Sequence, residues 1–199
     1  QLMRDDLTGS LINSNKKIAV FSGHQCAYVP ANIIACNHLV EQMPPIPSWG
    51  KHFYLGRMMS RSYYSYRVLA NEPNTRVFED AKLTKVLGPG EYYEGMSRKN
   101  LQVTADRPVL VAQYSQGLRN GDSVGDPMMI LISPTQQFLL KYRFATPISG
   151  SWKHFVNVVV PIHGIKSMLL DGKAIDQKLF EQLGVSRYSI AYIKIPYGT

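Results

Sequence analysis

Both cysteines of this 199-residue chain lie in one short stretch, and each has a histidine two positions away. The pairs are His24 with Cys26 and Cys36 with His38. Two thiolates and two imidazoles are suitable ligands for a tetrahedral zinc ion, and residues i and i+2 of a strand share a face. The same residues could instead supply a cysteine nucleophile with a histidine base. A disulfide between Cys26 and Cys36 is the third possibility.

The spacing and number of the cysteines favour the disulfide. Paired zinc ligands are usually separated by about two to four residues, whereas here only one residue separates them. The context of neither cysteine is typical of a catalytic thiol. A Cys26–Cys36 bond would close a loop of about ten residues, leave no cysteine over and fit an oxidising compartment. We therefore predict a disulfide that stiffens a recognition loop, with zinc bound by both cysteines, His24 and His38 as the alternative, and no cofactor.

The rest of the sequence has the pattern of an all-β protein, because short apolar segments alternate with turns rich in Gly, Pro, Asn and Asp. The segments 11–12 and 18–21 are expected to form a hairpin, and a turn is expected at 105–108. One short helix near the C-terminus is predicted over 174–183, where apolar residues recur at helical spacing. The expected strands are 11–12, 18–21, 66–70, 75–79, 91–94, 101–104, 109–114, 128–132, 138–144, 155–160, 167–170 and 188–195.

An internal repeat with an offset of about 90 residues runs through these segments. The matching pairs are 11–21 with 102–112, 38–45 with 127–134, 66–70 with 155–160, and 75–80 with 166–171. We predict tandem antiparallel β-sandwich-like units, with propeller-like blades as the alternative.

The repeat also predicts a division of the chain into units. The expected units are 1–44 (the end of a preceding repeat plus the disulfide loop), 45–118 (a first full repeat) and 119–199 (a second repeat, incomplete at its C-terminus). Open strand edges at both ends would need partners, either other domains or other chains of the same protein. Residues 198–199 are expected to continue into, or pair with, another polypeptide or the segment 1–23.

The formal charge of +8 favours acidic partners, but the basic residues are scattered rather than clustered. A solvated basic surface is therefore preferred to a nucleic-acid-binding arm, and a sulfated glycan or other polyanion stays as an alternative partner. No apolar run approaches the roughly 18 residues that a membrane-spanning helix needs.

A segment in which tyrosine and arginine alternate is the most suggestive candidate for partner binding. Arg61, Tyr63, Tyr64 and Arg67 supply the side chains that are enriched at the energetic centres of protein interfaces. If the segment is a strand, half of the tyrosines must face the core. We expect Arg61 and Tyr63 to be exposed.

Several motifs, in order, resemble the N-terminal domain of the IgG-Fc-binding protein family. They are VFSG at 20–23, Cys26, Cys36 followed by NHLVEQMPP at 37–45, WG at 49–50, and the segments 66–70, 107–117, 125–138, 156–161 and 170–172. Asn37 departs from the Asp of the family pattern. The resemblance implies a non-enzymatic module of a larger secreted protein, which contacts protein or glycan partners in a mucus, adhesive or cell-surface network. The alternative from another class is a metal-dependent hydrolase that uses His24 and His38.

Overall fold

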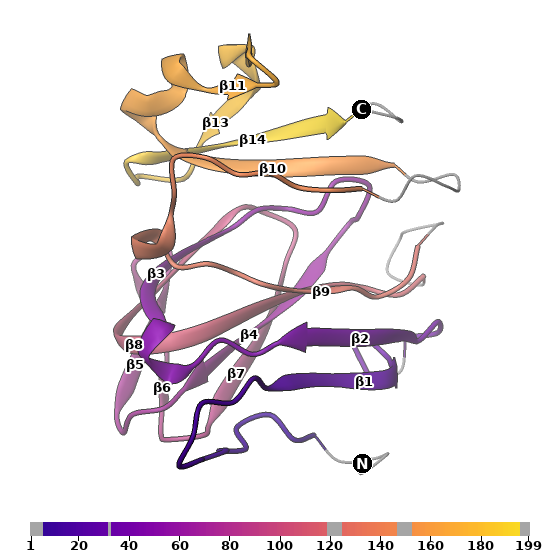
Figure 1. Cartoon of the computed structure of the whole chain (residues 1–199), viewed down its shortest axis with the longest axis vertical. Coiled ribbons are helices and arrows are strands. Elements are labelled where there is room, and N and C mark those ends of the chain that lie inside the picture. The colour runs from indigo at the N-terminus through magenta and orange to yellow at the C-terminus, as the bar shows by residue number, and fades with distance from the viewer. Residues whose placement is uncertain (1–5, 32, 119–124, 147–152, 196–199) are drawn as a thin grey trace. The chain divides into compact units, whose positions relative to one another are not determined.

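The computed structural model describes residues 6–31, 33–118, 125–146 and 153–195. The chain forms two compact units, residues 1–138 and 139–199, and both are built from antiparallel strands (Figure 1). The all-β prediction is confirmed. The boundary differs from the expected one at 118/119, because β9 (Met129–Leu131) pairs with a strand of the first unit. None of the helices in the described residues is long and apolar enough to cross a membrane.

One long strand, β8 (Leu101–Ser115), organises the first unit. Its first half pairs with β3 (Gly50–Leu55) and β5 (Thr75–Glu79), and its second half pairs with β4 (Tyr64–Ala70) and β9. The turn expected at 105–108 is wrong, because the strand continues through it. Pro108, which has no N–H to donate, lies between the residues that pair with β5 and those that pair with β4.

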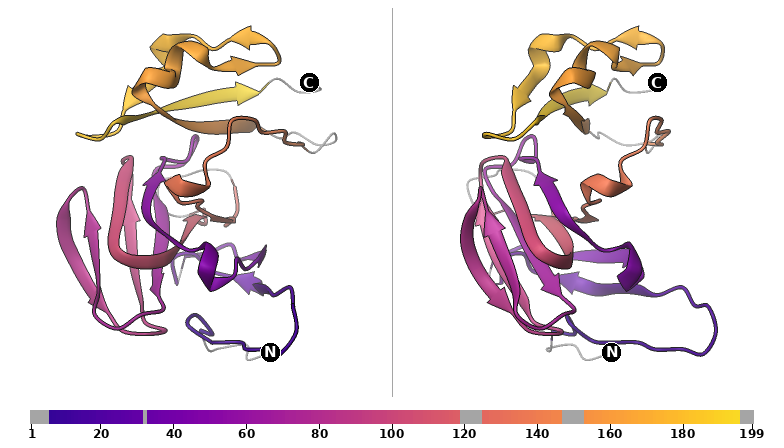
Figure 2. Two further views of the ribbon diagram at one scale, coloured as in Figure 1. Left: turned by 60° about the vertical axis from the view of Figure 1, so that its left-hand side comes forward. Right: turned by 90° about the vertical axis from the view of Figure 1, so that its left-hand side faces the viewer.

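The remaining strands of this sheet are β6 (Lys82–Leu87) and β7 (Tyr92–Ser97), which give the order β6-β5-β8-β4-β7. The sheet is strongly curled (Figure 2). Successive side chains of a strand point to opposite faces, so every second residue of β4 and β8 enters the core. Its fully buried members include Phe53, Leu55, Tyr64, Val68, Val77, Val103, Val109 and Val111.

The disulfide region forms a separate two-stranded sheet of β1 (Phe21–Ala27) and β2 (Asn37–Gln42). The hairpin expected from 11–12 and 18–21 is wrong: residues 11–20 have no strand structure, and β1 pairs with β2 instead. The local apolar pattern did not predict that the partner of β1 lies beyond the disulfide loop. After β2 the chain makes the 3-10 helix η1 (Ile46–Ser48) and enters β3.

The second unit contains a three-stranded sheet of order β10-β14-β13, made from β10 (His154–Pro161), β14 (Tyr188–Ile195) and β13 (Phe180–Gln182). A small hairpin joins β11 (Leu169–Leu170) to β12 (Lys173–Ala174), and η3 (Ile162–Ser167) precedes it.

Two predictions for the second unit are wrong. The helix expected over 174–183 is reduced to the 3-10 helix η4 (Gln177–Leu179), because Phe180 already pairs with Ala191 in the sheet. The strand expected over 138–144 is absent; residues 139–144 are irregular, and Leu140 is fully exposed. Strand propensity depends on a pairing partner, and the described strands give this segment none.

Candidate partner-binding surface

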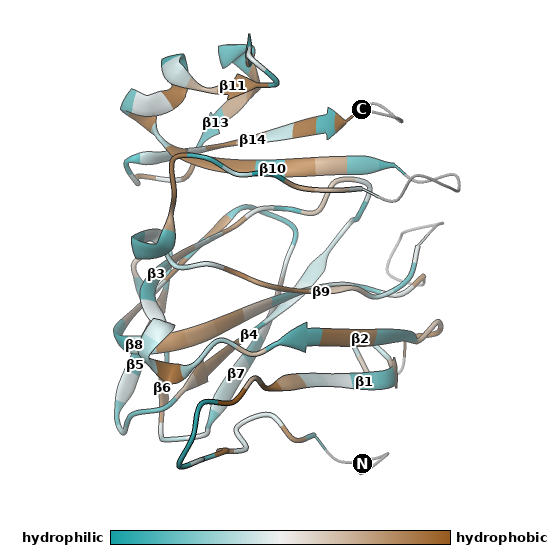
Figure 3. Cartoon of the chain, in the orientation of Figure 1, coloured by the Kyte–Doolittle hydropathy of each residue, from teal (hydrophilic) through white to brown (hydrophobic). Residues whose placement is uncertain are grey.

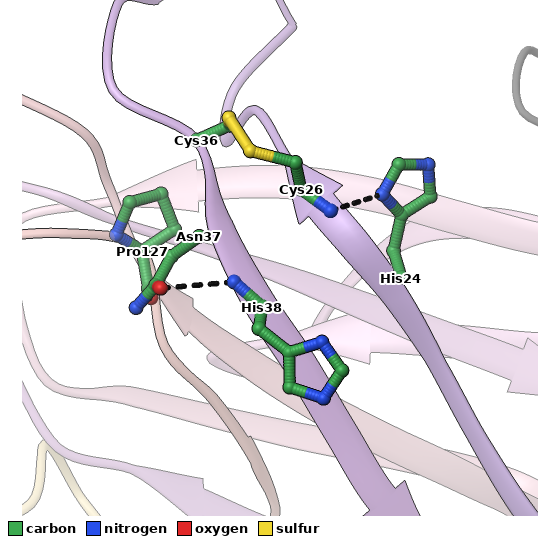
Figure 4. The surroundings of a disulfide bond; sticks show 6 residues. All are labelled: His24, Cys26, Cys36, Asn37, His38 and Pro127. Atoms are coloured by element: carbon green, nitrogen blue, oxygen red, sulfur yellow. Dashed lines mark hydrogen bonds between the residues drawn. A yellow bond between two sulfur atoms is a disulfide. The ribbon is translucent and has the colours of Figure 1, made fainter.

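The predicted disulfide between Cys26 and Cys36 is present (Figure 4). Cys26 lies near the end of β1 and Cys36 directly precedes β2, so the bond closes the loop of the β1–β2 hairpin. The Cα atoms are 4.9 Å apart, within the usual range for a bonded pair. Because both sulfurs are bonded, neither is a thiolate, and the alternatives of a four-ligand zinc site and a catalytic thiol do not fit this structure.

The two histidines next to the disulfide serve the local backbone or point outwards. Nδ1 of His24 accepts a hydrogen bond from the Cys26 N–H at 3.0 Å, and the His38 N–H donates to Oδ1 of Asn37 at 2.9 Å. In Figure 4 neither ring points at the sulfur atoms. Within the described residues no group of three or more His, Cys, Asp or Glu side chains could hold a metal ion. The hydrolase alternative therefore gains no site from this geometry.

Hydrogen bonds to two other segments of the first unit hold the disulfide loop in place. The Gly117 N–H donates to the Val29 carbonyl at 2.8 Å, and Nδ2 of Asn37 donates to the Pro127 carbonyl at 3.0 Å. Gly117 is required there: a Cβ at this position would lie 2.7 Å from the Ile34 carbonyl oxygen, a distance that real Cβ contacts avoid. The loop is thus fixed at three places, counting the disulfide.

The tyrosine and arginine segment is less accessible than expected. Arg61 and Tyr63 are half-buried rather than exposed. Tyr64 is fully buried, and its hydroxyl donates to the Lys99 carbonyl at 2.7 Å, so its side chain is not on the surface where a partner could contact it. The cause is the alternation of β4, which turns Tyr64 and Tyr66 inwards.

Arg67 is half-buried and bound within the chain. Its guanidinium contacts Asp6 at 2.7 Å and Glu94 at 2.6 Å, and it lies 4.7 Å from the centre of the Tyr92 ring. Burial opposes the charge of Arg67, but the hydrogen bond and charge of Glu94 and the charge of Asp6 raise its pKa overall. The structure therefore gives Arg67 an internal role, which is to hold the segment around Asp6 on the sheet.

Exposed apolar side chains gather on and beside the disulfide loop. Tyr28 and Ile34 are 56% and 51% exposed on the loop itself. Leu118 and Met128 are also exposed, and they directly follow Gly117 and Pro127, whose backbones bond to Val29 and Asn37. The guanidinium of Arg61 donates to the carbonyl of Asp126, next to Pro127, at 3.3 Å. We refer to Tyr28, Ile34, Arg61, Leu118 and Met128 as the disulfide-loop surface. The sequence shows the apolar residues inside the loop that the cysteines close. It does not show that the segments around Gly117 and Pro127 contact that loop.

Compared with protein families, the chain matches the family described as "IgGFc binding protein" over residues 1–199. Among curated proteins, the human IgGFc-binding protein is 27% identical over 196 residues, which is 96% of this chain and 4% of the length of that relative. No solved structure matches. The family match spans the whole sequence, the cysteine-containing hairpin included, and the chain therefore belongs to the IgGFc-binding protein family.

Proposed function

We propose that this chain is a non-catalytic, protein-binding module of an extracellular protein, and that it binds through the disulfide-loop surface. Membership of the family supports a binding role, and the disulfide supports an oxidising compartment outside the cytosol. The observation that carries the proposal is the coincidence of exposed apolar side chains with a loop that is fixed at three places.

Preorganisation is the physical basis of this assignment. Binding usually costs about 0.5–1.5 kcal/mol for each flexible side chain that is immobilised, and more when a loop must be ordered. The disulfide, the Gly117 contact and the Asn37 contact order the loop before any partner arrives. Tyr28 and Ile34 can then serve as anchors at the centre of an interface, and Arg61, which is bound to the Asp126 carbonyl, adds a cation to the surface.

The apolar character of this surface favours a protein partner over a sulfated glycan, since a polyanion would be recognised by a cluster of cations. The relative is named for binding the Fc part of IgG, so human IgG Fc is the partner we propose to test. A polyanion is the second candidate because the net charge of the chain is +8.

The test is surface plasmon resonance of the whole chain on immobilised IgG Fc and, separately, on heparin, at low and high salt. We expect binding to Fc that changes little with salt. The double variant Tyr28→Ala/Ile34→Ala should weaken it at least about tenfold, because the loss of two anchors costs more than 1.4 kcal/mol. The matched control is Leu83→Ala/Val86→Ala on β6, whose side chains are 49% and 48% exposed and lie outside this surface.

Equal weakening by the test and control variants would contradict the assigned surface. Absence of Fc binding, together with heparin binding that falls steeply with salt, would overturn the protein-binding proposal in favour of the polyanion alternative.

A further inference from the structure

The sequence repeat has a structural counterpart in two strand pairs. In β1–β2 the register pairs Phe21 with Gln42 and Gly23 with Val40; in β8–β9 it pairs Ala112 with Leu131 and Tyr114 with Met129. These registers coincide when β8 is aligned with β1 and β9 with β2 by the repeat. A further hydrogen bond also coincides: Met43 N–H to the Val20 carbonyl at 2.8 Å, and Ile132 N–H to the Val111 carbonyl at 2.9 Å.

The elements that follow agree with the same alignment. Pro45 precedes the 3-10 helix η1, which ends at Trp49. In the same way Pro134 precedes the 3-10 helix η2 (Thr135–Gln137), which ends at another aromatic residue, Phe138. The β5–β6 turn also recurs in the second unit. Its central residues Asp80 and Ala81 have positive φ, as Asp171 and Gly172 do between β11 and β12. The segment 18–24 therefore occupies the position in its repeat that 109–115 of β8 occupies in the next.

The two equivalent segments differ in burial. Val109 and Val111 are fully buried in the core, whereas their counterpart Ile18 is 55% exposed, and Val20 is half-buried. Phe21 is 66% exposed where its counterpart Ala112 is buried. On β8 the edge opposite β9 is paired with β4, and on β1 the edge opposite β2 has no strand among the described residues. A strand added at this edge of β1 would therefore take the place that β4 has beside β8.

The backbone of β1 is oriented to accept such a strand. Alternate residues of a strand direct their N–H and C=O groups to opposite edges. Val20 faces β2, since its carbonyl accepts from Met43, so Phe21 and Gly23 present their backbone groups to the open edge. Their counterpart Ala112 lies opposite Arg67 of β4.

We propose that the segment 18–24 adds, as an extra strand, to β10 of a second copy of this chain. β10 is the β4-type strand of the second unit: its sequence matches β4 in the repeat, and it leads to the second Asp-containing turn. Among the described strands it pairs only with β14, and it is hydrophobic over much of its length (Figure 3). The contact is head-to-tail, so it can propagate from copy to copy.

The test combines sedimentation velocity with hydrogen–deuterium exchange of the whole chain over a range of concentrations. We expect concentration-dependent association, with new protection of the amides of Phe21, Gly23 and β10. Ile18→Lys should weaken association at least tenfold, because the residue equivalent to Ile18 is buried on β8. Leu11→Lys is the matched control: Leu11 is 64% exposed, and its equivalent on β8 is the polar Gln102.

A second variant, Phe21→Pro, tests the backbone pairing directly, because it removes an N–H that faces away from β2. It should abolish the new protection while the disulfide hairpin stays folded. A chain that remains monomeric at its highest soluble concentration would overturn the proposal. So would association that Ile18→Lys and Leu11→Lys affect equally, or protection gained elsewhere.

Discussion

At the scale of single residues, Arg67 shows how the fold determines what a charged side chain can do. In the sequence it belongs to a segment typical of an interface, with tyrosines and a second arginine nearby. In the structure its guanidinium binds two carboxylates and lies over the Tyr92 ring. Nothing in the local sequence identifies Asp6 as a partner, because it lies 61 positions away in the chain. Only the packing of the N-terminal segment brings them together.

The Asp6 contact predicts a pH-dependent release of this segment. Partial burial opposes ionisation of Asp6, but hydrogen bonds from Thr8 and the charge of Arg67 lower its pKa overall below the ordinary value of 3.8. A lowered pKa in the folded state means that the contact is fully stabilising above pH 3.8 and is lost as the pH falls below that value. We expect amide exchange at Thr8 to rise in that range.

In Asp6→Asn the exchange at Thr8 should be fast at neutral pH and independent of pH once intrinsic rates are corrected. The cost in global stability should be at most about 1 kcal/mol, since the ion pair is partly exposed. Asp106→Asn, which removes the separate exposed pair with Arg76, is the control and should leave Thr8 unchanged. A wild-type chain whose Thr8 exchange ignores acidification would contradict this account.

At the scale of elements, local patterns predicted the strands that bury alternate residues. β4, β5, β10 and β14 were identified because their apolar residues recur with period two or as short runs. The continuity of β8 was missed, because Asp106 and Pro108 are typical of turns and only the change of partner strand explains them. The disulfide was predictable from the cysteine count, but the apolar surface beside it depends on long-range contacts to Gly117 and Pro127.

The dependence of the disulfide loop on Gly117 can be measured. Gly117→Ala places a methyl group against the carbonyls of Ile34 and Ala35, and backbone atoms cannot move aside as a side chain could. We expect a loss of about 1–3 kcal/mol in the free energy of unfolding, the usual cost of overpacking, measured by urea denaturation. The disulfide should also be reduced faster by dithiothreitol, because the loop no longer rests on the segment after β8.

Gly88→Ala is a suitable control for this substitution. Its Cβ would meet only the side chain of Glu91, at 3.3 Å, and that side chain can move. Equal stability and equal reduction rates for the wild type and Gly117→Ala would show that the Gly117 contact does not hold the loop.

At the scale of the whole molecule, the two units differ in the size of their cores. The first unit has a continuous cluster of buried residues from β3, β4, β5, β6 and β8. Among the residues of the second unit that the structure describes, 139–146 and 153–195, the buried apolar ones are Val160, Leu183, Ile190, Ala191 and Ile195. Residues 139–199 also carry eight of the Lys and Arg residues against three Asp and Glu, so self-repulsion adds to the weakness of a small core.

This difference predicts two unfolding transitions in urea, with the second unit unfolding first. Amide exchange followed residue by residue should show β14 opening at lower urea than β8. Ile190→Val removes one methylene from a fully buried side chain, so it should lower the free energy of the first transition by about 0.5–1.5 kcal/mol and lower only the first midpoint. Val111→Ala should lower only the second midpoint, because Val111 lies in the other core.

Added salt should raise the first midpoint more than the second, since it screens the excess positive charge of residues 139–199. A single transition shared by β8 and β14, shifted equally by both variants, would show instead that the two cores unfold as one cooperative structure.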